Sequence, residues 1–146
     1  MDMTPQEYGA YVKRIAPKSP LLKNTLLAFL VGGAICTLGQ GIRNGFLALG
    51  LDGTDAGTAT SVSLVFLSAL ATGLNGYNKL ARYAGAGTLV PITGFANAVV
   101  SPAIDFRAEG LVTGTAVKMF TIAGPVIVFG TLASAAYGIV LMLMGT

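Results

Sequence analysis

Long runs of apolar residues alternate with short polar connections along most of this chain. Residues 24–42 and 56–78 contain no charged side chain, and each run is long enough to cross a bilayer as an α-helix, which needs about 20 residues. Residues 119–146 form a third uncharged run. The pattern predicts an all-α integral membrane protein, whose first two spans lie near residues 22–42 and 57–77.

The first residues have a different pattern, which predicts a short amphipathic helix over residues 4–15. Thr4 suits the N-cap, Pro5 suits the first helical position, and Glu7 completes a capping box. One face carries apolar residues at the i, i+3, i+4 and i+7 positions, namely Tyr8, Tyr11, Val12 and Ile15. This face either lies on the lipid headgroups or docks a soluble partner.

The middle of the chain, residues 83–118, has the length of membrane structure but an irregular composition. Its uncharged part, residues 83–104, is long enough to cross, yet proline removes a backbone donor and clashes with the preceding turn. In a bilayer, broken backbone is tolerated only where protein or a water-filled cavity covers it. Such a segment indicates a protein that moves something across the membrane. The predicted helix breaks are Gly85, Gly87, Pro91, Gly94 and Pro102.

A charged cluster, Asp105, Arg107 and Glu109, follows this broken segment. Near the bilayer midplane each of these groups would cost on the order of 2.5–3.5 kcal/mol. The cluster therefore belongs at a membrane surface, and residues 83–104 are predicted to reach the far side. A middle segment that enters and leaves on the same side, giving three crossings, is the alternative.

Residues 110–146 are too long for one ordinary crossing of about 20 residues. We predict a half-helix over residues 110–122 and a final span over residues 125–144, with a break at Gly124 and Pro125 between them. The chain then holds about four membrane-embedded segments, one of which is broken.

The distribution of basic residues predicts the orientation. The N-terminal tail and the connection at 78–82 hold six of them, whereas the connections at 43–55 and 105–109 hold one each. Because cytoplasmic connections are enriched in Lys and Arg, both termini are predicted to be cytoplasmic. Residues 1–20 then form a cytoplasmic or interfacial segment, and residues 21–146 form a single membrane domain. The six basic residues are Lys13, Arg14, Lys18, Lys23, Lys79 and Arg82.

Small residues repeat at every fourth position in two of the predicted helices. Such ridges let another helix approach closely. They exceed what a chain this small needs for its own packing, so we predict a homo- or hetero-oligomer. The first ridge is Gly33, Thr37 and Gly41, and the second is Gly130, Ser134 and Gly138.

Composition supports the membrane class and argues against catalysis. The 146 residues are 53% hydrophobic and only 10% charged, whereas globular domains average about 25% charged residues. There is no histidine, and Cys36 is the single cysteine, so we predict no enzyme, no metal site and no cofactor. Residues 52–55 predict a turn followed by a helix N-cap rather than a calcium loop. The net charge of +3 gives no indication of nucleic-acid binding.

Polar residues inside the apolar middle are candidates for a solute path. Intramembrane ionisable residues are functional candidates by default, and hydroxyls, amides and helix starts suit carboxylates. The solute is therefore predicted to be an anion, since a cation path would favour a ring of acidic residues. Alternatively, the lysine snorkels to the surface and the other groups satisfy neighbouring backbone. The candidates are Thr88, Thr93, Asn97, Ser101 and Lys118.

The chain resembles the stage V sporulation protein AC family, which is related to the AE subunits of the same operon. The resemblance runs from about residue 18 to residue 138 and is carried by three blocks: LKNTLLAFLVGGAICTLGQ, GAGTLVPITGFANAVVSPAIDF and EGLVTGTAVKMFTIAGPVIVFG. It implies a subunit of the SpoVA apparatus in the inner membrane of the forespore and spore. This apparatus moves dipicolinic acid with calcium into the developing spore and lets it out at germination. Members of the family are described as mechanosensitive channels.

The resemblance also implies partners, namely the other SpoVA subunits, including AD and AE, besides membrane lipid. Two functions stay open at this point. The first is a channel subunit that conducts the solute. The second is a non-conducting membrane scaffold that recruits other subunits through its N-terminal helix and its small-residue ridges.

Overall fold

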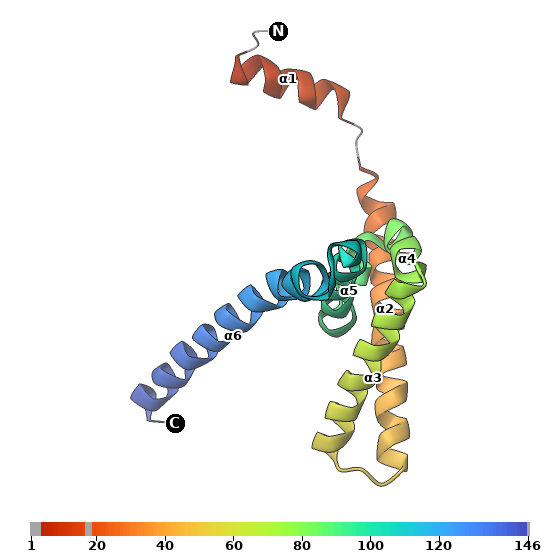
Figure 1. Cartoon of the computed structure of the whole chain (residues 1–146), viewed down its shortest axis with the longest axis vertical. Coiled ribbons are helices and arrows are strands. Elements are labelled where there is room, and N and C mark those ends of the chain that lie inside the picture. Colours follow the sequence, from red (N-terminus) through yellow and green to blue (C-terminus); the bar gives the residue numbers. More distant parts are fainter. Residues whose placement is uncertain (1–3, 17–18, 146) are drawn as a thin grey trace.

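The computed structural model describes residues 4–16 and 19–145, and these residues form helices with no strand among them (Figure 1). The all-α prediction is confirmed. Lys18, which we counted in the basic tail, lies outside the described residues. In chain order the elements are α1 (Pro5–Ile15), α2 (Leu21–Ala48), α3 (Gly53–Gly73), α4 (Gly76–Ala84), the 3₁₀ turn η1 (Gly85–Thr88), α5 (Pro91–Asp105), the 3₁₀ turn η2 (Arg107–Glu109), the π-helical turn η3 (Leu111–Ala116) and α6 (Val117–Met144).

Helix α1 begins with the predicted capping box. The Glu7 amide donates to Thr4 Oγ1 at 3.3 Å, and the Thr4 amide donates to Glu7 Oε2 at 2.9 Å. These bonds satisfy two of the backbone donors that a helix start leaves free. The apolar face of Tyr8, Tyr11, Val12 and Ile15 is exposed, so its predicted contact with lipid or a partner stays a prediction.

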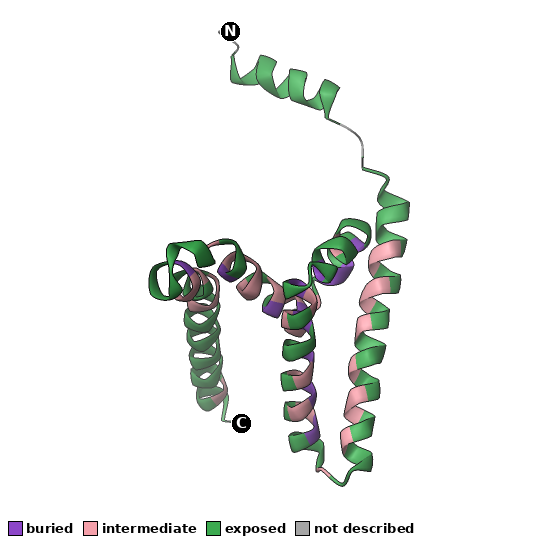
Figure 2. Cartoon of the chain, turned by 45° about the vertical axis from the view of Figure 1, so that its right-hand side comes forward, coloured by how far each residue is buried: buried purple, intermediate pink, exposed green. Residues whose placement is uncertain are grey.

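Helices α2 and α3 form a hairpin and lie side by side (Figures 1 and 2). Gly50, with φ of +92°, turns the chain, and Asp52 then caps α3 through bonds of 2.9 Å and 2.7 Å from the Thr54 and Asp55 amides to its Oδ1. The predicted helix N-cap is confirmed at Asp52, whereas the turn lies before residues 52–55, at Gly50. The buried side of α3 is a row at four-residue spacing, namely Ala56, Thr60, Leu64, Ser68 and Thr72.

The backbone after α4 is irregular at three of the predicted positions, Gly85, Gly87 and Pro91. Gly85 has φ of +51°, a conformation that favours glycine, and the chain then forms η1 before Pro91 starts α5. A Cβ on Gly87 would lie 2.5 Å from the Ala28 carbonyl oxygen, so only glycine lets η1 rest on α2. The irregular turn is thereby covered by protein on one side.

The predicted breaks at Gly94 and Pro102 are wrong, because both residues lie inside the continuous helix α5. Gly94 instead permits close packing, since a Cβ there would lie 2.8 Å from the Thr88 carbonyl oxygen. Pro102 sits in the last turn of α5, where the loss of one backbone donor does not end the helix.

The predicted half-helix that ends near residue 122 is also wrong. Helix α6 runs without interruption through Gly124 and Pro125, and together with η3 it forms one apolar stretch, Leu111–Met144. The local irregularity lies earlier, in the π-helical turn η3. A single proline removes one hydrogen bond, and a long apolar helix in lipid continues past it because every other backbone group must stay paired.

Among the described residues, three helical stretches are long and apolar enough to cross a membrane: Leu21–Ala48, Gly53–Gly73 and Leu111–Met144. Helix α5 has 15 residues, which is roughly 22 Å and short of a hydrocarbon core of about 30 Å. The structure therefore fits the three-crossing alternative rather than the four crossings that we predicted.

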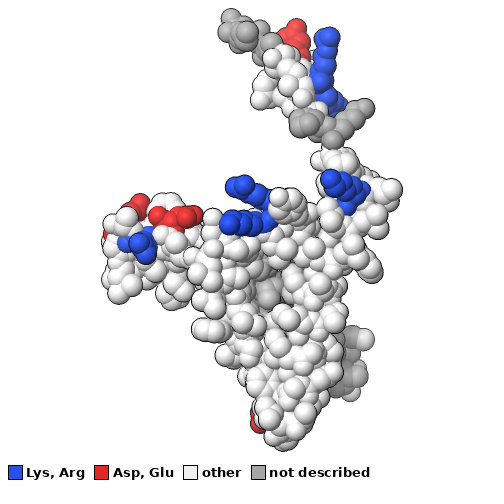
Figure 3. Space-filling model, turned by 90° about the vertical axis from the view of Figure 1, so that its right-hand side faces the viewer, with Lys and Arg blue, Asp and Glu red and all other residues white. Residues whose placement is uncertain are grey.

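The position of the α5–α6 connection agrees with three crossings. In Figures 1 and 2 this connection lies at the same end of the molecule as α4, and α6 then runs back toward the level of the α2–α3 turn. Figure 3 shows basic side chains gathered at the α4 end, with acidic and basic side chains of the connection at the same level. These charges thus lie near one surface, as their solvation cost requires.

Candidate functional site

Helices α3 and α5 meet through a cluster of polar side chains, which we call the polar seam: Ser68, Thr72, Thr93 and Asn97. Ser68 Oγ donates to the Thr93 carbonyl oxygen at 2.6 Å. The Thr72 hydroxyl donates to Asn97 Oδ1 at 2.9 Å and shares its proton with the Ser68 carbonyl oxygen at 2.7 Å. Hydrogen bonds between side chain and backbone, and between two side chains, therefore join the helices.

Three of the four polar residues of the seam are buried, and Asn97 is half-buried. Ser68, Thr72 and Thr93 keep 3%, 5% and 6% of their surface exposed. Thr93 Oγ1 has no hydrogen-bond partner among the described residues. A buried hydroxyl without a partner is unfavourable and uncommon in native proteins. The seam is thus a polar interface in which one buried hydroxyl, that of Thr93, has no partner among the described residues.

The structure brings together only part of the predicted path. Thr93 and Asn97 belong to the seam, and Ser101 lies half-buried one turn further along α5. Thr88 lies in η1, where its hydroxyl donates to the Gly85 carbonyl oxygen at 2.9 Å. The Thr88 carbonyl oxygen accepts a 2.8 Å bond from the Tyr77 hydroxyl. Thr88 therefore holds the turn rather than extending the seam.

Lys118 lies at the start of α6, beside the corner that ends α5. Its Nζ is 3.9 Å from the centroid of the Phe106 ring, a cation–π contact. The side chain is half-buried. This contact places the positive charge at the charged α5–α6 connection, which suits the snorkelling alternative as well as a role at the end of a path.

No residue of α3 was among the predicted site residues, although Ser68 and Thr72 form half of the seam. The signal that could have found them is the four-residue spacing of the row from Ala56 to Thr72, which places these hydroxyls on one face. In the sequence, the polar residues of the broken segment are more conspicuous, because glycine and proline surround them.

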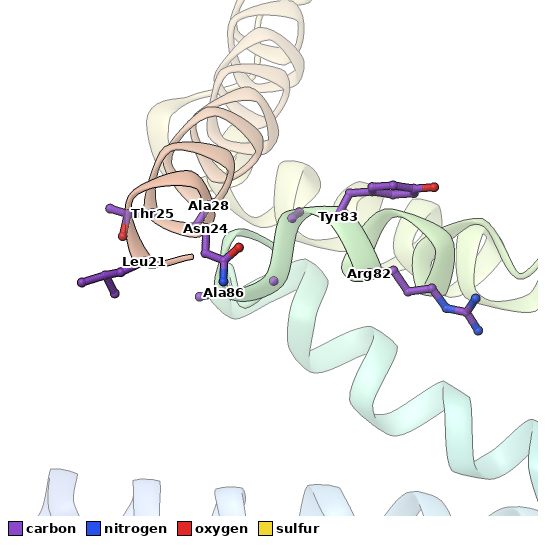
Figure 4. Close-up of a pocket in the computed structure, with 9 residues that line it drawn as sticks. Leu21, Asn24, Thr25, Ala28, Arg82, Tyr83 and Ala86 are labelled. Atoms are coloured by element: carbon purple, nitrogen blue, oxygen red, sulfur yellow. The ribbon is translucent and has the colours of Figure 1, made fainter. Parts of the chain in front are cut away.

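A pocket of about 550 Å³ lies between the start of α2 and the α4–η1 corner. Figure 4 shows Asn24 directed toward the η1 backbone near Ala86, whereas the Arg82 guanidinium points away from α2. Among the pocket residues labelled in Figure 4, no charged side chain therefore points toward Asn24. The lining residues are Leu21, Asn24, Thr25, Ala28, Arg82, Tyr83, Ala84, Gly85 and Ala86.

The predicted packing ridges face outward. Gly33, Thr37 and Gly41 of α2 are exposed, and the same holds for Gly130, Ser134 and Gly138 of α6. A Cβ added to any of these four glycines would meet nothing within 4 Å. Within the chain, α2 instead presents Gly32 to η1 and Gly39 to Leu64. Contact through the outward ridges stays a prediction for other chains.

The part of the chain that the structure describes contains no cluster of metal-ligating side chains. Among these residues, no three of the types His, Cys, Asp and Glu come together in a way that could hold a metal ion. The polar groups that the structure does gather are hydroxyls, an amide and backbone carbonyls. Such groups bind and orient a solute and do not supply a nucleophile–base pair.

Comparison with known proteins agrees with the resemblance seen in the sequence. The family model of the SpoVAC/SpoVAEB sporulation membrane protein matches residues 24–140. Stage V sporulation protein AC of Bacillus subtilis (strain 168) is 43% identical over 136 residues, which cover 92% of this chain and 91% of the relative. No solved structure matches. The chain therefore belongs to the SpoVAC/SpoVAEB family of sporulation membrane proteins.

Proposed function

We propose that this protein is a channel subunit of the SpoVA complex, which moves dipicolinic acid with calcium into the forespore and out at germination. The observation that carries the proposal is the polar seam between α3 and α5. Such side chains also join membrane helices, but the buried Thr93 hydroxyl, which has no partner among the described residues, adds nothing to that contact. Polar groups inside a membrane domain are costly and are typical of solute paths.

The chemistry of the seam suits an anionic solute. Dipicolinic acid is a rigid dicarboxylate, and hydroxyl and amide groups such as those of Thr93, Asn97 and Ser101 can donate hydrogen bonds to carboxylate oxygens. The seam occupies the last turns of α3, directly before α4, which carries Lys79 and Arg82. Basic residues near the entrance of a path raise the local concentration of an anion.

The outward small-residue ridges support an assembly, whereas the rest of the exposed apolar surface is the kind that lipid covers. None of the residues of α2 or α6 is buried. We propose that the outward ridges of these helices contact further copies or the other SpoVA subunits, including AD and AE. In the spore inner membrane, small-residue ridges that interlock weakly would also let helices slide under bilayer tension.

The proposed orientation has the N-terminus in the cytoplasm, on the basis of the basic residues in α1, at the start of α2 and in α4. Lys23, Lys79 and Arg82 would then lie at the cytoplasmic surface, together with the α5–α6 connection. A dianion that leaves the cytoplasm would meet the basic surface before it reaches the seam.

A second candidate function is a non-conducting scaffold. The exposed face of α1 and the outward ridges favour it, since both are surfaces that the described part of the chain leaves uncovered. A flux measurement separates the two functions. Purified chain in liposomes loaded with dipicolinate should release it faster than liposomes without protein, and Ser101→Ala or Lys118→Ala should slow the release. If the protein is only a scaffold, neither the parent protein nor the variants should release dipicolinate faster than liposomes without protein.

A further inference from the structure

The two hydrogen bonds that cross the polar seam lie one helical turn apart on both helices. On α3 the donors are Ser68 and Thr72, and on α5 the acceptors belong to Thr93 and Asn97. In both pairs α3 donates and α5 accepts. Because residues four apart lie on one helix face, the two bonds act along the same line of contact.

We propose that Ser68 and Thr72 are positioning residues whose two hydrogen bonds across the seam, which we call the latch, hold α5 against α3, and that the structure is the closed state of the conduit. This inference rests on the proposed function. In the closed state the seam is occupied by bonds within the protein, so its polar groups face one another and no passage runs between them. Opening requires α5 to move away from α3.

The chemistry of the two faces makes separation feasible. The α3 side of the seam carries Ser68 and Thr72, and the α5 side carries Thr93 and Asn97. Once water enters, it can replace each bond that crosses the seam, and it can also satisfy Thr93 Oγ1, which has no partner among the described residues. The dry bonded state pairs the groups that cross the seam and leaves only Thr93 Oγ1 of the described residues without a partner, and the wet separated state satisfies all of them, whereas a partly open dry state is costly.

The backbone around α5 permits such a movement. Gly85 and the short turn η1 separate α5 from α4, so α5 is not continuous with the helix before it. At its other end, α5 contacts η3 and the exposed helix α6. A change in how α6 sits among lipids or partner subunits would be transmitted to α5 through these contacts.

Cross-linking tests whether the seam must open. In a Cys36→Ala background, the pair Thr72→Cys and Asn97→Cys places thiols where the side-chain hydrogen bond now lies. Oxidation should form a disulfide, and liposomes with the oxidised protein should lose dipicolinate release that a reductant restores. Equal release before and after reduction would overturn the proposal, and so would failure of the disulfide to form.

Single substitutions give a second test with a matched control. Thr72→Val removes the bond across the seam, and we expect basal release to rise roughly fivefold, the effect of one net hydrogen bond. Thr58→Val changes the same residue type on the same helix, but the Thr58 hydroxyl bonds its own helix, at the Thr54 carbonyl oxygen 3.1 Å away. Release by Thr58→Val should equal that of the parent. Equal release by both variants would contradict the latch.

A labelling measurement separates failure of this inference from failure of the proposed function. With Cys36→Ala and Thr93→Cys, a water-soluble maleimide reports how often the seam opens, whether or not the chain conducts. Adding Thr72→Val should raise the labelling rate, and adding Thr58→Val should not. If release is absent but labelling responds in this way, the latch stands and conduction fails. If labelling does not respond, the latch is overturned.

Discussion

Gly87 of η1 rests directly on the backbone of Ala28 in α2. A Cβ at Gly87 would lie 2.5 Å from the Ala28 carbonyl oxygen and 2.8 Å from its Cα. From the side of α2, Gly32 faces the Gly87 carbonyl oxygen, which a Cβ on Gly32 would approach to 3.3 Å. The irregular turn between α4 and α5 is thus fixed against the first membrane helix by glycine on both sides.

Gly87→Ala should therefore destabilise the protein. The contact is with backbone, which cannot rotate away, and overpacking of this kind costs about 1–3 kcal/mol. Thermal unfolding in detergent should show a lower Tm. Gly57→Ala is the control, because a Cβ at Gly57 meets nothing within 4 Å. Identical Tm values for the two variants would mean that η1 does not rest on α2.

Tyr77→Phe should also destabilise the turn. The buried Tyr77 hydroxyl donates to the Thr88 carbonyl oxygen at 2.8 Å, and loss of a buried donor costs about 1–3 kcal/mol. Tyr83→Phe removes a hydroxyl from a neighbouring tyrosine that is 76% exposed, so its Tm should stay near that of the parent. If Tyr77→Phe unfolds no earlier than Tyr83→Phe, the bond does not support the turn.

The sequence predicted several elements well because their signals are local. Thr4, Glu7 and Asp52 cap helices through atoms within three residues, and such contacts can be read from spacing alone. Gly94 and Pro102 show the limit of this reasoning. Both residues disfavour helix in isolation, yet packing decides their role, and packing depends on residues far away in the chain.

Local sequence patterns also could not predict which face of α2 packs against the rest of the chain. Gly32 and Gly33 are adjacent, and they lie on different sides of the helix. Contact with η1 and α3 selects the side of Gly32 and Gly39. The number of crossings depends in the same way on where α5 ends, which no single segment of the sequence determines.

The side of the membrane on which the C-terminus lies depends on the number of crossings, and three helices are long and apolar enough to cross. With three crossings, the end of α6 lies on the opposite side of the membrane from the start of α2. A C-terminal alkaline phosphatase fusion should be active and a C-terminal green fluorescent protein fusion should be dark, if the N-terminus is cytoplasmic. Four crossings would give the reverse result for both fusions.

The capping box of α1 should respond to pH. The Thr4 amide and then the Thr4 hydroxyl donate to the Glu7 carboxylate, which holds the pKa of Glu7 below its ordinary value of 4.5. A lowered pKa means that the cap stabilises α1 fully above pH 4.5, and that this contribution is lost as pH falls through the lowered value. The NMR signals of the α1 backbone amides should therefore lose intensity as the pH falls through that range.

A carbon-detected NMR titration of the Glu7 carboxylate in the full chain measures whether its pKa is lowered. Thr4→Val removes the hydroxyl bond and keeps the backbone amide, so the pKa of Glu7 should rise part of the way toward its ordinary value. An unchanged Glu7 pKa in Thr4→Val would show that the hydroxyl takes no part in the cap.

A conduit along α5 requires that water reaches one side of this helix in the working protein. Single cysteines on a Cys36→Ala background measure this directly, with a water-soluble maleimide applied to the assembled complex in membranes. We expect Asn97→Cys and Ser101→Cys to react several-fold faster than Phe95→Cys and Ile104→Cys, which lie at exposed apolar positions of the same helix. Equally slow reaction at all four positions would mean that lipid or dry protein surrounds α5, and would contradict a conduit along it.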